Sequence, residues 1–220
     1  MFESKHPPAT IFRLARKPDP WQPPDWSRAN PDGTFGNRFD DPEGYYRVIY
    51  AATQKLSCFL ETLSRFRADL SLLAELNDIE GENDFFPLGT VPREWCDERL
   101  LGFAHADGNY ADIYASGWIL LLRHRLAGEC VRLGVSDLDA SVLQQHAPRR
   151  ITQLASLEVR RRNFDGVYYR SRFGHDLENW ALFEPFKLSR EGSVGIAVDD
   201  ATFLEALGML GLRGGNDHGP

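Results

Sequence analysis

The feature that most constrains the fold is a helical stripe of apolar residues that directly follows a strand-like run. Residues Tyr45 to Ala52 are rich in aromatic and β-branched side chains, which predicts a strand. From Thr53 to Leu73 the apolar residues recur every three or four positions, at Leu56, Phe59, Leu60, Leu63, Phe66 and Leu70. This spacing predicts a helix with one buried face. The chain must therefore pack a helix against a sheet here.

The rest of the chain changes between strand and helix patterns without regular alternation. Strands are expected at Ile11 to Leu14, Leu100 to Ala104, Gly166 to Tyr169, Ala181 to Phe186 and Ser193 to Val198. Helices are expected at Ala111 to Leu133, Asp137 to His146, Arg149 to Arg162 and, with Asp200 as a cap, through Leu210. Strands early and late around a helical middle predict an α+β fold. Asn77 to Pro92, with two glycines and two prolines, is expected to form a long loop that serves as a lid or a partner surface.

Length and composition are those of one domain with a substantial core. The chain has 220 residues, of which 42% are hydrophobic. We expect a lead-in over residues 1–10 and a main domain over residues 11–186. Residues 187–220 are expected to form an extension made of a short strand, a helix and a flexible tail.

Charge and cysteine content restrict partners and compartment. A net charge of -7 argues against direct binding to nucleic acid, which needs clustered Lys and Arg in surplus. Cys58, Cys96 and Cys130 are an odd number without a metal or redox spacing, which favours a reducing compartment. No stretch has the length and apolar character of a signal peptide or a membrane span. We therefore expect a cytoplasmic protein.

Several enzyme classes lack their motifs. The six histidines never take the spacing of a zinc site, so no metal is expected. The Gly-x-Ser-x-Gly elbow, the Gly-x-Gly-x-x-Gly fingerprint and the Walker loop are all missing from the sequence. Serine hydrolysis, a Rossmann site and a nucleoside triphosphate site are therefore not supported.

Two charged residues are candidates for a site. Arg38 lies in the turn Gly36-Asn37-Arg38-Phe39-Asp40, where a guanidinium could bind phosphate oxygens in pairs; an ion pair with Asp40 or Asp41 is the structural alternative. Glu61 lies roughly opposite the apolar stripe of its helix, beside small residues. It is either a solvated surface glutamate or a carboxylate that faces a cleft and stabilises positive charge.

Two hydroxyl groups join these candidates. Tyr50 ends the strand that precedes the helix, where it serves either a site or the core. Ser171 follows a strand-like run and precedes Arg172 and Gly174, a transition that presents a hydroxyl and backbone N–H groups. A turn serine without a functional role is the alternative.

Taken in order, these segments resemble the RES domain family. The family pattern is similar to Gly36-Asn37-Arg38-Phe39, then Val48-Ile49-Tyr50-Ala51-Ala52, Phe59-Leu60-Glu61, and Asp165-Gly166-Val167-Tyr168-Tyr169-Arg170-Ser171, with Asn179 to Phe183 extending the match. The resemblance covers roughly residues 11–186. Two departures concern loop geometry: Phe39 stands where a tryptophan is more usual, and the segment Asp41 to Tyr46 is expanded.

The resemblance implies a fold similar to ADP-ribosyltransferase toxins, a single domain with a split central β-sheet and flanking helices. It implies that Arg38, Tyr50, Glu61 and Ser171 are catalytic. Arg38 would contact the pyrophosphate or an incoming phosphate, Tyr50 would stack near the nicotinamide or ribose, and Glu61 would hold the ribose and stabilise its cation. Ser171 would orient the ribose or the acceptor. A substrate-binding role is expected for Arg13, Asn37, Phe39, Tyr169, Arg172 and Asn179.

The implied activity is cleavage of the nicotinamide–ribose bond of NAD, as an NAD phosphorylase or glycohydrolase. NAD would be a substrate rather than a resident cofactor, and inorganic phosphate would be a co-substrate. The resemblance also implies a bacterial toxin paired with an Xre-like helix-turn-helix antitoxin. A protein ADP-ribosyltransferase and a non-catalytic binding module are the alternative functions, and a homodimer stays open.

Overall fold

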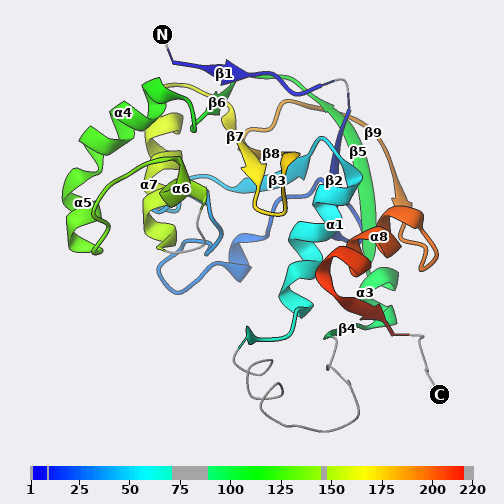
Figure 1. The fold of residues 1–220 in the computed structure, drawn as a ribbon. Helices are drawn as coiled ribbons and strands as arrows, with labels where there is room; N and C mark the ends of the chain where they lie inside the picture. The colour runs from blue at the N-terminus through cyan, green and yellow to red at the C-terminus, as the bar shows by residue number, and fades with distance from the viewer. Residues whose placement is uncertain (1, 9, 71–88, 145–147, 216–220) are drawn as a thin grey trace, which may run out of the picture.

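The fold is built on one curled sheet with helices on its outer side (Figure 1). The structure, a computed structural model, describes residues 2–8, 10–70, 89–144 and 148–215. Within these ranges no helix is both long and apolar enough to cross a membrane. Of the predicted loop over residues 77–92, the part up to residue 88 lies outside the described residues.

The main sheet has eight strands in the order β1-β6-β7-β8-β3-β2-β5-β9. Their bounds are β1 Ser4–Lys5, β2 Ile11–Arg16, β3 Val48–Ala52, β5 Arg99–Ala106, β6 Tyr110–Asp112, β7 Gly166–Ser171, β8 Gly174–Phe183 and β9 Leu188–Gly195. A second sheet pairs β4 Gly89–Val91 with β10 Leu212–Gly214. All neighbours in the main sheet are antiparallel except β6 and β7. The predicted α+β class is confirmed.

The helices fall into two groups on either side of the β7–β8 hairpin (Figure 1). The first group is α4 Ser116–Arg125, α5 Ala127–Arg132, α6 Ala140–Gln144 and α7 Arg149–Arg160. The second is α1 Lys55–Leu63, α3 Arg93–Asp97 and α8 Ala201–Leu210. Short 3-10 turns lie at Trp26–Arg28, before β3, and at Ser64–Phe66, directly after α1. Asp200 caps α8 as predicted, since its Oδ1 accepts a hydrogen bond of 2.9 Å from the backbone N–H of Phe203.

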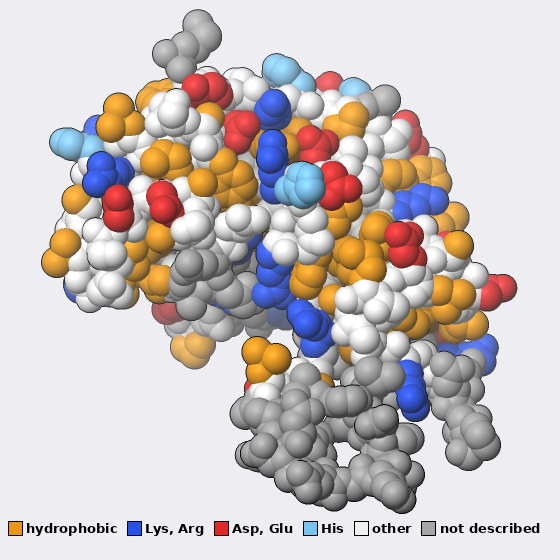
Figure 2. Space-filling view, viewed as in Figure 1, with side chains coloured by type: hydrophobic (Ala, Val, Ile, Leu, Met, Phe, Trp, Pro, Cys, Tyr) orange, Lys and Arg blue, Asp and Glu red, His pale blue; other side chains and the backbone are white. Residues whose placement is uncertain are grey.

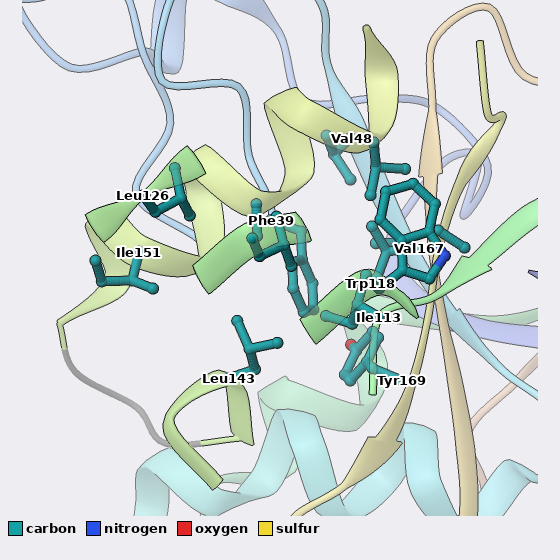
Figure 3. Packing of buried hydrophobic residues seen from close by; sticks show 14 of the residues in the cluster. Phe39, Val48, Ile113, Trp118, Leu126, Leu143, Ile151, Val167 and Tyr169 are labelled. Atoms are coloured by element: carbon teal, nitrogen blue, oxygen red, sulfur yellow. The ribbon is translucent and has the colours of Figure 1, made fainter. Parts of the chain in front are cut away.

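The side chains of β3 contribute to all three clusters of buried residues. Val48 belongs to the cluster beneath α4 and α7, and Ala52 belongs to the cluster beneath α1 and α8. Ile49 and Ala51 point to the other face of the sheet, into a third cluster with Trp180. Successive strand residues point to opposite faces, so one short strand serves all three. Figure 3 shows the first cluster, in which Phe39, Ile113, Trp118 and Tyr169 lie close together.

The sheet is nearly divided between β2 and β3. These strands share a single register pair, Phe12 with Ala52, whereas β2 and β5 pair along the whole of β2. Arg13 lies beside this opening and donates from Nη1 to the carbonyl oxygen of Tyr50 at 2.8 Å. A side chain therefore takes a backbone acceptor at the place where the ladder of hydrogen bonds stops.

Two predicted helices differ from the structure by several residues at one end. The helix expected from Thr53 to Leu73 ends at Leu63, and Leu70 is 78% exposed, so the predicted stripe is wrong beyond the Ser64–Phe66 turn. Phe66 instead packs edge-on against the ring of Trp95. Residues 71–73 lie outside the described residues.

The helix expected from Ala111 to Leu133 is wrong at its start. Ala111 is extended in β6, because it pairs with Val167 of β7, and the helical segment begins at Ser116 and is divided at Leu126. The other predicted strands and helices are present with shifted ends.

The domain boundaries at residues 10 and 186 remain predictions. β1, from the expected lead-in, and β9, from the expected extension, are the two edge strands of the main sheet. α8, also in the expected extension, packs on α1, with the rings of Phe59 and Phe203 5.7 Å apart.

The packing of α1 predicts a stability difference between two leucines on helices. Leu60, on the buried face of α1, is fully buried, so Leu60→Ala should lower the free energy of unfolding by about 2–5 kcal/mol. Leu120 on α4 is 71% exposed, and Leu120→Ala should change it by less than about 0.5 kcal/mol. Urea denaturation measures both, and equal losses would contradict this packing.

Candidate active site

The candidate site lies where the two helix groups meet the central strands. Tyr169 of β7 and Asn179 of β8 are register partners, so their side chains share one face of the sheet. Glu61 reaches that face from α1, and Ser171 reaches it from the end of β7. The boundary between two hydrophobic clusters thus carries the polar groups.

Glu61 is held by two strands at once. Its Oε1 accepts a hydrogen bond of 2.8 Å from Ser171 Oγ and one of 3.3 Å from Asn179 Nδ2. Ser171 and Asn179 are buried, and Glu61 is half-buried. Ser171 Oγ in turn accepts from the backbone N–H of Phe173 at 3.1 Å. The surface-glutamate alternative is therefore wrong, because Glu61 points into the fold.

Arg38 stacks on aromatic rings rather than pairing with an acid. Its guanidinium carbon lies 5.1 Å from the ring centre of Phe39 and 5.3 Å from that of Tyr169. Nη2 donates to the Tyr114 hydroxyl at 3.4 Å and to the carbonyl oxygen of Leu143. Among the described residues, Nε of Arg38 is buried without a hydrogen-bond partner. An ion pair of Arg38 with Asp40 or Asp41 does not occur in the described parts of the chain.

Tyr50 fixes the turn that carries Arg38. The Tyr50 hydroxyl donates to Asp40 Oδ1 at 2.8 Å and accepts from the backbone N–H of Phe39 at 2.9 Å. Asp40 Oδ2 accepts from the backbone N–H of Asn37 at 2.8 Å. Burial raises the pKa of the Tyr50 hydroxyl well above its usual value, and the nearby Asp40 charge adds to this rise. Tyr50 is therefore neutral at pH 7 and acts here as a clamp between turn and strand.

Tyr169 lies close enough to Glu61 and Arg38 for both charges to act on its hydroxyl. Burial raises the pKa of its hydroxyl, the Glu61 charge raises it further, and the Arg38 charge opposes the rise. Its ring packs on Phe39, which is fully buried, with centroids 4.9 Å apart. The predicted residues Glu61, Ser171, Asn179, Tyr169, Phe39 and Arg38 thus form one connected group.

Three other predicted residues lie outside this group of contacts. Arg13 and Asn37 line a cavity of about 780 Å³ together with Tyr50. The Arg13 guanidinium also donates from Nε to the carbonyl oxygen of Pro20 at 2.6 Å, and burial lowers its pKa to about 10, so it stays charged at neutral pH. Arg172 is exposed and donates from Nη2 to Ser64 Oγ at 3.1 Å.

Sequence reasoning missed three contributing residues. Tyr114 contacts Arg38 across 76 positions of sequence, for which the sequence carries no local signal. Asp40 adjoins the Arg38 turn and was considered only as an ion-pair partner. Ser57 stands four residues before Glu61, on the same helix face, and its hydroxyl donates to Asn179 Oδ1 at 2.8 Å. That spacing was the available signal.

A second cavity and a line of basic side chains lie near the candidate site. A cavity of about 380 Å³ is lined by Tyr114, which contacts Arg38, and by Gln144, Arg170 and His175, among others. In Figure 2, Lys and Arg side chains form a line down the middle of the face viewed, around the place where Figure 1 draws the β7–β8 hairpin. Among the described residues, no three His, Cys, Asp or Glu side chains gather as metal ligands.

Comparisons with known proteins identify the fold and the family. The structure is similar to one chain in the crystal structure of the MbcT-MbcA toxin-antitoxin complex of M. tuberculosis, with a TM-score of 0.52. The two chains share 15% sequence identity, and the match covers 89% of this chain and 86% of the other. The expected toxin-like α+β fold is thereby confirmed. A search of curated proteins gave no match. The RES domain pattern matches residues 10–196, most of the sequence, and the chain therefore belongs to the RES domain family.

Proposed function

We propose that the protein degrades NAD by cleaving the bond between nicotinamide and ribose. The observation that carries this proposal is the carboxylate of Glu61, whose Oε1 is fixed by Ser171 and Asn179. Among the described residues, both donors go to Oε1, which leaves Oε2 for a ligand. A fixed carboxylate in a partly dehydrated site stabilises positive charge on a sugar carbon.

The chemistry requires little else from the protein. Nicotinamide in NAD is already cationic, so the carbon–nitrogen bond breaks with its electron pair going to the ring nitrogen, and no acid is needed. The remaining ribose carries oxocarbenium character, as in glycoside hydrolysis. Phosphate or water then forms the new bond at the same carbon. Glu61 would stabilise the cation in both cases.

Arg38 suits the anionic part of the substrate. The stacked guanidinium has a fixed plane, and its buried Nε lacks a partner among the described residues. A planar guanidinium can donate two parallel hydrogen bonds to phosphate oxygens, which an ammonium group cannot do. We assign Arg38 to the pyrophosphate or to an incoming phosphate, with Phe39 and Tyr169 as its supports.

The cavity of about 780 Å³ supports binding of an extended substrate, because Arg13, Asn37 and Tyr50 line it together. We propose that these residues contact the substrate away from Glu61. Ser171 would orient the ribose or acceptor, and Arg172, exposed nearby, would attract phosphate. With phosphate, phosphorolysis yields a phosphorylated ADP-ribose, whereas hydrolysis yields free ADP-ribose. Mass analysis of the products with and without phosphate distinguishes these outcomes from transfer to a protein.

The fold match extends the proposal to a partner. The similar chain is described in a toxin-antitoxin complex, and we propose that this protein is likewise a toxin restrained by an antitoxin of the helix-turn-helix type. A small helix-turn-helix gene beside its own, whose product binds the purified protein, would support this pairing. If the protein degrades NAD but binds no such helix-turn-helix protein, the antitoxin proposal is refuted and the enzyme proposal is unaffected.

Loss of the Glu61 charge should slow the proposed reaction. Glu61→Gln keeps an oxygen that can accept from Ser171 and Asn179 but removes the charge, so nicotinamide release should fall by at least about 100-fold. Chromatographic measurement of nicotinamide from NAD gives the rate. Glu205→Gln, on the exposed side of α8, is the matched control and should retain the parent rate. Equal rates for parent and Glu61→Gln would refute the proposal.

Replacement of the Arg38 guanidinium should weaken substrate binding. Arg38→Lys keeps the charge but loses the planar stack and the paired donors, so KM for NAD or for phosphate should rise by about tenfold or more. Steady-state kinetics with each substrate varied in turn identifies which one Arg38 binds. Arg125→Lys on α4, an exposed site, is the control. Unchanged KM values for both substrates would remove Arg38 from the binding site.

A further inference from the structure

We propose that Ser57 is a positioning residue for Glu61 and acts through the side-chain amide of Asn179. This inference rests on the proposed function, because it assigns Glu61 the central role. The geometry that supports it is a continuous chain of hydrogen bonds. Ser57 Oγ donates to Asn179 Oδ1 at 2.8 Å, and Asn179 Nδ2 donates to Glu61 Oε1 at 3.3 Å.

The chain of bonds has only one consistent direction. An ionised carboxylate accepts hydrogen bonds and donates none, so Asn179 must turn its NH₂ group toward Glu61. Its carbonyl oxygen then faces Ser57 and needs a donor. The Ser57 hydroxyl supplies that donor, and each bond in such a chain polarises the next.

Burial makes this donor necessary. Ser57 is 0% exposed and Asn179 is 2% exposed, so solvent is a poor substitute for the missing partner. A buried polar atom without a hydrogen bond is costly, so removing Ser57 leaves the Asn179 carbonyl oxygen unpaired and the amide less firmly held. Rotation of the amide would not restore a partner, because it would bring Asn179 Oδ1 toward the Glu61 carboxylate, where two acceptors repel each other.

The location of the three residues favours a role in orientation. Ser57 and Glu61 stand one helical turn apart on α1, and Asn179 lies in β8 between β3 and β7. The amide thus links the helix to the middle of the sheet. With the amide less firmly held, Ser171 would be the one described donor still fixed to Glu61 Oε1, and the carboxylate would be less well oriented.

The experiment compares three substitutions in the full chain. In Ser57→Ala, kcat for nicotinamide release should fall by about tenfold to a hundredfold. KM for NAD should stay within about twofold, since Ser57 does not reach the substrate. Ser57→Thr keeps a donor and should restore most of kcat. Thr62→Val is the control on the same helix, because the Thr62 hydroxyl bonds to the backbone carbonyl oxygen of Cys58 and should leave kcat unchanged.

A second measurement does not depend on activity. The side-chain NH₂ signal of Asn179 in an NMR spectrum should exchange with solvent at least about tenfold faster in Ser57→Ala than in the parent or in Thr62→Val. If Ser57→Ala does not fold, Ser57→Cys, with a weak donor of similar size, replaces it and should show the same direction of change.

The two measurements separate the two proposals. A parent protein that releases no nicotinamide refutes the proposed function, while the exchange rate still tests the link from Ser57 to Asn179. An unchanged kcat in Ser57→Ala of an active protein, or a Ser57→Thr variant as slow as Ser57→Ala, overturns the positioning role. An unchanged exchange rate overturns it as well.

Discussion

The interaction on which the site depends is the pair of hydrogen bonds to Glu61 Oε1. A half-buried carboxylate needs donors, and here they come from β7 and from β8, so the bonds fix α1 to two strands at once. The arrangement orders the helix, the hairpin and the carboxylate together. Donors from both strands offset the cost of desolvating the carboxylate, which ties the stability of this region to its chemistry.

Arg38 follows a different principle, in which aromatic rings replace acids. Phe39 and Tyr169 provide faces on which a cation can rest without being neutralised, and Tyr50 holds the turn from the other side through Asp40. An arginine paired with an aspartate would have less capacity for an anionic ligand. The sequence alternative of an Arg38 ion pair fails because the Asp40 carboxylate is already occupied by Tyr50 and Asn37.

Much of the fold and of the candidate site could be predicted from the sequence. The remainder could not, for physical reasons. The strand and helix around Tyr50 and Glu61 follow from local periodicity, but periodicity alone placed Glu61 on a solvated face. Its partner Ser171 lies 110 residues away, a contact that only the order of several motifs suggested. No local pattern indicates the contact of Tyr114 with Arg38, which spans 76 positions of sequence. A helix is wrongly expected at Ala111 because its pairing with Val167 is a long-range property. The hydrogen bond from Arg13 to Tyr50 could not be predicted either, because it depends on where the sheet opens between β2 and β3.

The two ends of the main sheet bear on self-association. β1 has two residues, and β9 is exposed along nearly its whole length, with a register shift opposite Phe103 and Ala104. Arg190 in β9 pairs with Asp19, and Glu191 follows it. Short, irregular and charged edges resist the addition of a further strand. Sheet-to-sheet joining of two copies is thereby disfavoured, and a homodimer would have to use helical or loop surfaces instead.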